Sequence, residues 1–295
     1  MDAIDQIVDR LSIFKNLYDI IRIVDPVSKK AIACEENTSC KIVETCFKFW
    51  EKESFCKNCV SMRAYREKDT SIKLEYKDDK VYITIASPVT IDDKLYIVEM
   101  LKDITTGSSI LNNGLHVHNV EKFVMEMNNK IVIDELLGVY NRRHLMERLP
   151  ADMNESISNN QPISIIALDV DLFSYVNQAY GFKSGDKILK ELVQIVTRYT
   201  EGEKNWIARF GGDKLMIVLN KYNLQASYIL AENLRQAIEN IGFVCDSTLV
   251  KITVSLSVCE LTGAKIDCDK LFQIIKDSMY EVKSQGRNRT IIKKL

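Results

Sequence analysis

Residues Arg209–Leu219 read Arg-Phe-Gly-Gly-Asp-Lys-Leu-Met-Ile-Val-Leu, and this stretch decides the fold of the second half of the chain. Two adjacent glycines separate two runs that are mostly apolar, and Asp213 follows them at once. Paired glycines before a strand favour a tight hairpin, because their backbone adopts positive φ without a steric penalty. An acidic residue at such a tip is held at the edge of a sheet, where it can reach a metal ion or a cation bound to phosphate. Alone, a Gly-Gly-Asp hairpin is more often only a turn.

The length of 295 residues predicts two domains, because single cores usually stop growing before that size. Basic and acidic residues nearly cancel, at 40 and 41, so we do not expect polymeric nucleic acid as a partner. No apolar run approaches the ~20 residues that span a bilayer. The acidic N-terminus also differs from a signal peptide. We therefore expect a cytoplasmic protein without a membrane partner.

The first half of the chain reads as a small antiparallel domain. Two short strands are followed by a mixed segment and then by three strands rich in β-branched and aromatic residues, at 20–25, 31–34, 71–76, 81–86 and 95–101. This order, and the closing Asp103-Ile104-Thr105, resemble a PAS sensor domain over about residues 15–106. The resemblance implies an α+β fold with an antiparallel sheet and a sensing role.

Five of the eight cysteines fall within one segment of 26 residues in this first domain, at Cys34, Cys40, Cys46, Cys56 and Cys59. The last two form a Cys-x-x-Cys motif. Four such thiolates could bind Zn²⁺ or an iron–sulfur cluster. A thiol redox switch and buried structural cysteines are the alternatives. The three histidines of the chain lie outside this segment.

Apolar residues at three- or four-residue steps predict a helix between the two domains, namely Val120, Phe123, Met127 and Ile131. Such a stripe suits pairing with a second copy in a homodimer, or packing of the helix on its own domain. We therefore divide the chain into a sensor domain at 1–106, a helical linker at 107–133 and a second domain at 134–295.

The second domain alternates helices with apolar strands. We expect helices at 141–149, 184–199, 223–241 and 269–285, with strands at 163–169 and 251–258 and the hairpin at 207–219. This alternation predicts a mixed sheet covered by helices, within an α+β protein.

Five motifs of the second domain resemble, in the right order, the GGDEF domain of diguanylate cyclases, which condense two GTP into cyclic di-GMP. These are Asp134–Arg143, Asp169–Phe173, the set Asn177, Gly181, Gly185, Asp186 and Leu189, then Thr253–Ser257, and finally Lys283–Asn288. The resemblance covers residues 134–292 and implies the family's fold.

The resemblance also implies roles for single residues. The carboxylates of Asp169 and Asp213, with the carbonyl of Val170, would hold Mg²⁺ together with phosphate oxygens. Asn177 and Asp186 offer the donors and acceptors that suit a guanine edge, and Phe173 belongs to the same nucleotide-binding set. Lys283 and Arg287 lie four residues apart, so we expect them on one helix face, where they meet a triphosphate.

The signature itself departs from the family. It reads Gly211, Gly212, Asp213, Lys214 and Leu215, so Lys214 replaces the acid of the fourth position. A cation there disfavours the second metal ion that two-metal phosphoryl chemistry requires. Ser174, Gln178 and Phe182 also replace the family's usual Lys, Asp and His, and the inhibitory Arg-x-x-Asp position reads Gly-Glu-Lys-Asn at 202–205. No intact catalytic set remains, and we expect a degenerate domain without cyclase activity.

These observations favour a signalling protein that binds GTP with Mg²⁺ as a switch under control of the sensor domain, acting on an unidentified downstream protein. An active diguanylate cyclase that tolerates Lys214 is the alternative. A non-catalytic dimerisation or interaction module is the third possibility.

Overall fold

The computed structural model describes residues 11, 14, 17–33, 41–105, 117–202, 204–245, 248–263 and 266–295. Contacts between residues divide the chain into two compact units, Met1–Val132 and Ile133–Leu295. Each unit has its own sheet and its own apolar core. Within the described part of the chain, no helix combines the length and the apolar character that crossing a membrane requires.

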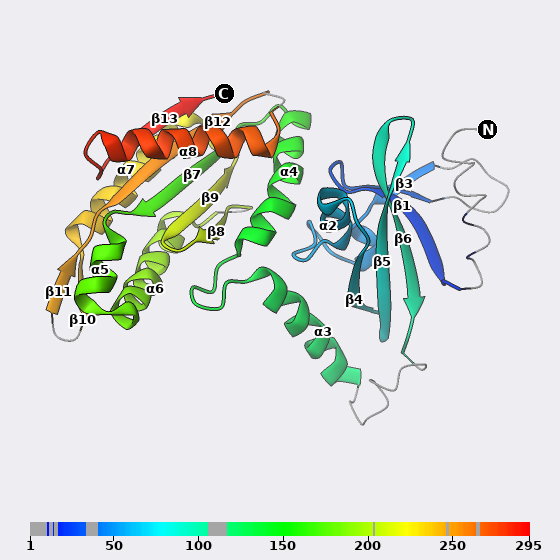
Figure 1. Ribbon diagram of the computed structural model, residues 1–295. Coiled ribbons are helices and arrows are strands. Elements are labelled where there is room, and N and C mark those ends of the chain that lie inside the picture. Colours follow the sequence, from blue (N-terminus) through cyan, green and yellow to red (C-terminus); the bar gives the residue numbers. More distant parts are fainter. Residues whose placement is uncertain are drawn as a thin grey trace. The chain divides into compact units, whose positions relative to one another are not determined.

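The first unit is built on a sheet in which all pairings between neighbouring strands are antiparallel. Its order across the described residues is β3-β2-β1-β6-β5-β4 (Figure 1). The strands are β1 (Ile20–Asp25), β2 (Lys30–Ala33), β3 (Lys41–Thr45), β4 (Ser71–Lys77), β5 (Lys80–Ile91) and β6 (Lys94–Asp103). The antiparallel sheet predicted for the first half of the chain is thereby confirmed, with β3 as a strand that the sequence pattern did not reveal.

Two hairpins of this sheet have a pair of aspartates in their turns. Asp78 and Asp79 connect β4 to β5, and Asp92 and Asp93 connect β5 to β6. All four residues have positive φ, between 47° and 59°. Two consecutive residues of positive φ match the right-handed twist of the flanking strands, and Asp tolerates this conformation better than most residues do. These turns fix the register of the meander.

Two helices lie on opposite faces of this sheet. Side chains alternate along a strand, so Val81 and Ala86 of β5 point to opposite faces. Helix α2 (Val60–Glu67) packs Ala64 against Ala86, while helix α3 (Val117–Val132) packs Val120 and Val124 near Val81. A short 3-10 helix, η2 (Lys48–Trp50), precedes α2. Helix α3 therefore packs through apolar side chains on the sheet of the first unit, to which it belongs.

The apolar stripe predicted for α3 is only partly covered by that contact. Val120 is 6% exposed, whereas Phe123 and Met127 are 41% and 45% exposed. The exposed pair leaves an apolar strip along the helix, and its pairing with a second copy of the chain stays a prediction.

The second unit contains a mixed sheet with the order β13-β12-β7-β9-β8 among the described residues. The β12–β13 pair is parallel and the other pairs are antiparallel. The strands are β7 (Ile163–Val170), β8 (Trp206–Gly211), β9 (Lys214–Asn220), β12 (Val254–Leu261) and β13 (Thr290–Lys294), with a separate hairpin of β10 (Gly242–Cys245) and β11 (Thr248–Lys251).

Helices cover both faces of this sheet, as the alternation of the sequence predicts (Figure 1). On one face, α5 (Phe173–Tyr180), α6 (Phe182–Tyr199) and α7 (Leu224–Asn240) enclose the larger core. On the other, α4 (Arg142–Ser158) and α8 (Cys268–Ser284) enclose a second core. Along β7, Ile166 and Leu168 face the first core, whereas Ile165 and Ala167 face the second.

Two predicted boundaries in this unit are wrong, and the helix–turn–helix that the resemblance implies around Gly181 is present. The helix expected to end at 149 continues through Pro150 to Ser158, because a helix can tolerate the loss of one backbone donor when its apolar face stays packed. The segment 173–180 is a helix of its own, separated from α6 by Gly181 at φ 80°. The strand expected at 251–258 is two elements, with β11 ending at Lys251 and β12 beginning at Val254.

Candidate functional site

The Gly-Gly-Asp-Lys segment forms the hairpin tip between β8 and β9. Gly211 and Gly212 have φ of 150° and 59°, a region that favours glycine over residues with a side chain. The pairing shifts register between Arg209 and Gly211, so Phe210 sits in a bulge. The predicted hairpin is confirmed, and it places Asp213 and Lys214 at the edge of the sheet.

Asp169 lies beside this tip because β7 pairs with β9. In the register of the two strands, Asp169 is directly opposite Lys214. Alternation along β7 turns its carboxylate to the same face as Ala167, which is the face covered by α4 and α8. The sequence-predicted pair of carboxylates, Asp169 and Asp213, is thus brought to one end of the sheet.

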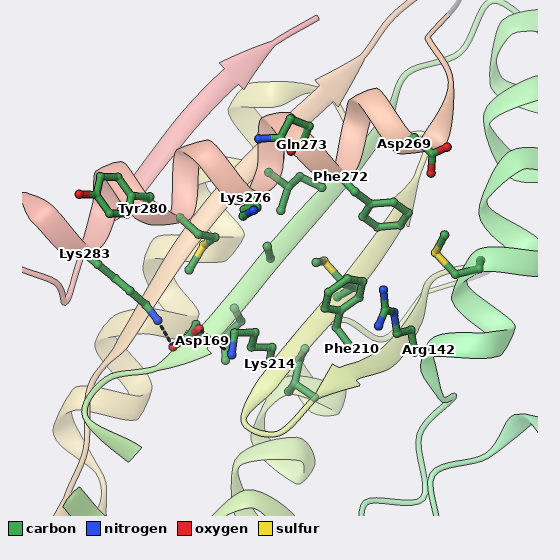
Figure 2. A pocket seen from close by; sticks show the side chains of 17 residues that line it. Arg142, Asp169, Phe210, Lys214, Asp269, Phe272, Gln273, Lys276, Tyr280 and Lys283 are labelled. Carbon is green, nitrogen blue, oxygen red and sulfur yellow. Dashed lines mark ion pairs between the residues drawn. The ribbon is translucent and has the colours of Figure 1, made fainter. Parts of the chain in front are cut away.

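Two lysines flank the carboxylate of Asp169, whose side chain is only 5% exposed (Figure 2). The Lys283 Nζ lies 2.8 Å from Asp169 Oδ1, and the Lys214 Nζ lies 3.7 Å from Asp169 Oδ2. The same Lys214 Nζ is also 3.7 Å from Asp213 Oδ1. The ammonium group of Lys214 therefore lies between the two carboxylates expected to bind a metal ion.

Asp213 is harder to ionise than an ordinary aspartate. Burial raises its pKa above the usual value, and the negative charge of Asp169 raises it further. Lys214 and Lys283 lower the pKa but do not cancel the two raising effects. A carboxyl group with a raised pKa loses its charge at a higher pH, so its capacity to bind a cation weakens sooner on acidification.

Asp171 has a structural role that the sequence pattern did not reveal. It is buried and accepts hydrogen bonds from Thr253 Oγ1 at 2.7 Å, from Ser255 Oγ at 2.6 Å and from the Asn288 backbone N–H at 3.0 Å. The last bond ties the turn after α8 to the end of β7. The signal in the sequence is the short spacing from Asp169, which places a second carboxylate at the end of the same strand.

The expectation that Lys283 and Arg287 share a helix face is wrong. Helix α8 ends at Ser284, and Gly286 and Arg287 follow with φ of 110° and 62°. Residues with positive φ end a helix, so Arg287 lies beyond α8 and does not share a helix face with Lys283. Lys283 remains on the helix and pairs with Asp169, whereas Arg287 is exposed in the turn that Asp171 anchors.

The residues expected to contact a guanine base lie together on α5 and α6. A Cβ atom added to Gly185 would lie 2.0 Å from Asn177 Oδ1 and 3.1 Å from Phe173 Cζ. Only glycine therefore lets both side chains pack against the first turns of α6, next to Asp186. Asn177 and Phe173 are partly buried and Asp186 is exposed. Val170 is buried in the core and offers only its backbone carbonyl to a ligand.

A second polar anchor connects the hairpin tip to the start of the unit. Arg209 Nη1 lies 3.1 Å from both carboxylate oxygens of Asp134, and Arg209 Nε donates to the Gly212 carbonyl oxygen at 2.8 Å. The Asp134 carboxylate also accepts from the backbone N–H groups of Leu136 and Leu137. The segment that follows α3 is therefore joined to the signature turn by one arginine.

A cavity of about 520 Å³ extends from Asp169, Lys214 and Lys283 along the face covered by α4 and α8. Figure 2 shows Phe210 and Phe272 facing each other within it, with Arg142 beside Phe210. No local sequence pattern reveals this cavity, because its residues come from α4, β7, the hairpin and α8, which are far apart in the chain.

The cysteine segment of the first unit is described only in part, since Cys34 and Cys40 lie outside the described residues. Cys46, Cys56 and Cys59 line a cavity of about 20 Å³, and all three are free thiols. Burial is the main cause of the raised pKa of Cys46, which is about 12. It is also the main cause of the raised pKa values of Cys56 and Cys59. Within the described ranges, no three His, Cys, Asp or Glu residues are arranged to hold a metal ion.

Comparisons with known proteins agree with the fold of the second unit. The sequence model described as "Diguanylate cyclase, GGDEF domain" matches residues 131–289. Among solved structures, the coiled coil and GGDEF domain of DgcB from Caulobacter crescentus in complex with c-di-GMP has a TM-score of 0.58 at 19% identity, covering 64% of this chain and 100% of its own. SiaD from Pseudomonas aeruginosa, solved with its activator SiaC, has a TM-score of 0.53 at 23% identity, covering 60% of this chain and 68% of its own.

Curated relatives include uncharacterized membrane proteins of Staphylococcus aureus, strains USA300 and NCTC 8325, which are 28% identical over 212 residues. The match covers 71% of this chain and 59% of theirs, so the chain spans less than two thirds of their length. Their names contradict the cytoplasmic location that the sequence predicts. The charge and hydropathy of this sequence give no sign of the membrane location that those names state.

Replacing Asp171 by alanine tests its anchoring role. The substitution removes one acceptor from three hydrogen bonds and leaves the Ser255 hydroxyl buried without it, so we expect the free energy of unfolding to fall by about 2 kcal/mol or more. Urea denaturation measures the change. Asp186→Ala, at an exposed position, is the matched control and should stay within about 0.5 kcal/mol of the unsubstituted chain. Equal losses in the two variants would contradict the assignment.

Proposed function

Because this chain belongs to the GGDEF domain family, we propose that its second unit binds GTP as a switch and turns it over poorly, under control of a PAS-like first unit. The observation that carries the proposal is the position of Lys214, whose ammonium lies 3.7 Å from Asp169 and 3.7 Å from Asp213. A positive charge thereby occupies the place where the family's chemistry needs an acid.

The size of the electrostatic effect of Lys214 argues against the binding of two metal ions. Two unit charges about 4 Å apart interact by about 1 kcal/mol in water and about 4 kcal/mol at an effective dielectric constant of 20. Lys214 is 49% exposed, so its repulsion of a cation falls between these limits. The absence of the family's acid at this position also removes an attraction between a carboxylate and the metal ion, and that attraction is of comparable size. Two-metal phosphoryl transfer depends on closely placed acids, which makes turnover slow.

One Mg²⁺ still fits the donors that remain. Asp169, Asp213 and the Val170 carbonyl would hold the ion, and the half-exposed Lys214 side chain has room to turn toward solvent. A bound Mg²⁺ would neutralise part of the triphosphate charge. Lys214 supplies positive charge at the same place, so nucleotide binding should depend only weakly on the ion.

The remaining contacts of the nucleotide divide between base and phosphates. Asn177, Asp186 and Phe173 lie together and would hold the guanine edge. Lys283 and Arg287 would contact the phosphates, Lys283 from the end of α8 and Arg287 from the turn held by Asp171. A diguanylate cyclase that tolerates Lys214 is the second candidate function, favoured by the presence of both Asp169 and Asp213 at one sheet edge.

Control by the first unit would run through α3. Asn58, between the two cysteines of the Cys-x-x-Cys motif, is 2% exposed and donates to Asn128 Oδ1 at 2.8 Å. Asn128 in turn donates to the Leu74 carbonyl of the edge strand β4 at 3.1 Å. Helix α3 ends at Val132, and Asp134 follows almost at once with its bond to Arg209. A change at the cysteine turn thus has a continuous covalent and hydrogen-bonded path to the signature hairpin.

The sheet order of the first unit, with β1 and β2 beside the β4–β5–β6 meander, supports the PAS-like interpretation. The nature of its input is a separate matter. Zinc or an iron–sulfur cluster at the cysteine segment, and a homodimer through Phe123 and Met127 of α3, stay predictions of the same scheme.

Titration calorimetry with GTP and with ATP tests the proposed nucleotide. We expect GTP to bind at least tenfold tighter, because the Asp186 carboxylate can accept from the N1–H and the 2-amino group of guanine, both of which adenine lacks. Tenfold corresponds to about 1.4 kcal/mol. Asp186→Ala should abolish this preference, whereas Asp277→Ala, an exposed acid on α8, should keep it. Equal affinity for the two nucleotides, or no binding, would show that the second unit is not a GTP switch.

Lys214→Glu tests the electrostatic argument directly. Restoring the acid should raise the rate of cyclic di-GMP formation from GTP with Mg²⁺ or Mn²⁺ by at least tenfold, measured by chromatography of the products. Lys190→Glu makes the same charge change on exposed α6 and should leave the rate unchanged. Rapid product formation by the unsubstituted chain would support the cyclase alternative instead.

Asn128→Ala tests the path from the cysteine turn to α3. Loss of the amide should increase hydrogen exchange in residues 56–59 and in α3 together, because it breaks both bonds that join them to β4 and to each other. Asn129→Ala, at the exposed neighbouring position, should change neither segment. Faster exchange in α3 alone would mean that the cysteine turn is not coupled to the helix.

A further inference from the structure

The cavity between α4 and α8 is separate from the residues expected to bind guanine. Its floor is the β7 and β9 face that carries Ala167 and Met216, and its walls are the two helices. Phe173 packs against the core on the other face of the sheet, with Asn177 beside it at Gly185. None of the guanine-contacting residues lines the cavity. Only the end that holds Asp169 is shared with the nucleotide site.

The body of the cavity is apolar and adaptable. Phe210 and Phe272 form a tilted ring pair with centroids 5.6 Å apart, and both rings are partly exposed toward the cavity. Met146, Met216 and Met279 complete the apolar wall. Methionine side chains are flexible and accommodate apolar groups of different shapes. A volume of about 520 Å³ lies within the range typical of small-molecule sites.

The charged residues around this apolar space are mostly positive. Four cations line it, Arg142, Lys214, Lys276 and Lys283, against two acids, Asp169 and Asp269. Asp169 is already paired with two of the lysines. Across the described residues, Arg142 and Lys276 have no carboxylate partner, and Arg142 lies 4.6 Å from the centre of the Phe210 ring. A ligand with a negative group would therefore find two available cations beside an apolar wall.

We propose that this cavity binds a small amphipathic anion, with an apolar body against Phe210, Phe272 and the methionines and a carboxylate, sulfonate or phosphate near Arg142 and Lys276. An acyl carboxylate and a planar aromatic anion share this chemistry, and the experiment below uses one probe of each kind. The site is distinct from the guanine pocket, and the cavity meets the proposed nucleotide site only at the end that holds Asp169.

The anion and the nucleotide would oppose each other, a consequence that rests on the proposed function. Lys214 and Lys283 line the cavity and also flank Asp169, where the phosphates of GTP would lie. Both anions would lie along one cavity, where their like charges repel each other, so each ligand lowers the affinity of the other. Thermodynamic linkage requires this effect to be reciprocal and equal in both directions.

Fluorescence titration of the full chain with anilinonaphthalene sulfonate tests the site. We expect saturable binding that decanoate displaces. Phe272→Ala should weaken binding of the probe at least tenfold, whereas Phe182→Ala should not change it, although Phe182 is 78% exposed on the first turn of α6. Equal effects of the two variants would show that the probe binds exposed aromatic surface, and would overturn the proposal.

A second variant changes only a surface charge, so it tests the binding site without disturbing the fold. Lys276 is exposed, so Lys276→Met should leave the fold intact and weaken the probe about fivefold, while Lys251→Met on exposed β11 should leave it unchanged. No effect of Lys276→Met would overturn the assignment of an anion. Failure of decanoate to displace the probe would overturn the acyl form of the ligand.

The antagonism is measured by titrating GTP in saturating decanoate, where we expect the GTP dissociation constant to rise at least threefold. An unchanged constant would overturn the antagonism. If GTP does not bind in either condition, the proposed nucleotide switch fails, and the probe titrations still decide whether the cavity is a binding site.

Discussion

The pairing of Asp169 with two lysines is the interaction on which the second unit depends. A buried carboxylate is costly unless a cation or several donors compensate its charge. In this chain Lys283 comes from α8 and Lys214 from the hairpin, so the ion pairs join the last helix and the signature turn to β7. The two lysines therefore compensate the carboxylate charge at this end of the sheet.

The sequence was sufficient to predict features that depend on local pattern. The glycine pair predicted the hairpin, and the alternation of helices with apolar strands predicted the mixed sheet. The grouping of Asn177 with Asp186 came from the family resemblance. Features that depend on long-range contacts were missed. Asp171 meets Ser255 across 84 residues and Asn288 across 117, and no local pattern reports such a bond.

The first unit shows the same limit for charges and cysteines. Strand positions followed from β-branched residues, but the sequence did not show that Arg22 and Glu99 form a buried pair across 77 residues, or that Glu99 also accepts from Ser61. These groups share a small cavity with the thiols of Cys46 and Cys59. Burial, and not a neighbouring anion, is the main cause of the raised thiol pKa values, so these cysteines are poor nucleophiles as free thiols.

The substitution of an acid by Lys214 changes the kind of ligand that this face of the sheet attracts. A third carboxylate beside Asp169 and Asp213 would make the edge a site for cations. With Lys214, Lys283, Lys276 and Arg142 along one cavity, the same face carries more positive than negative charge. The apolar wall of Phe210 and Phe272 adds a preference for ligands with an apolar body. Lys214 thus bears on both proposals, because the charge that slows metal-dependent turnover also adds to the positive charge that Arg142 and Lys276 give to the cavity.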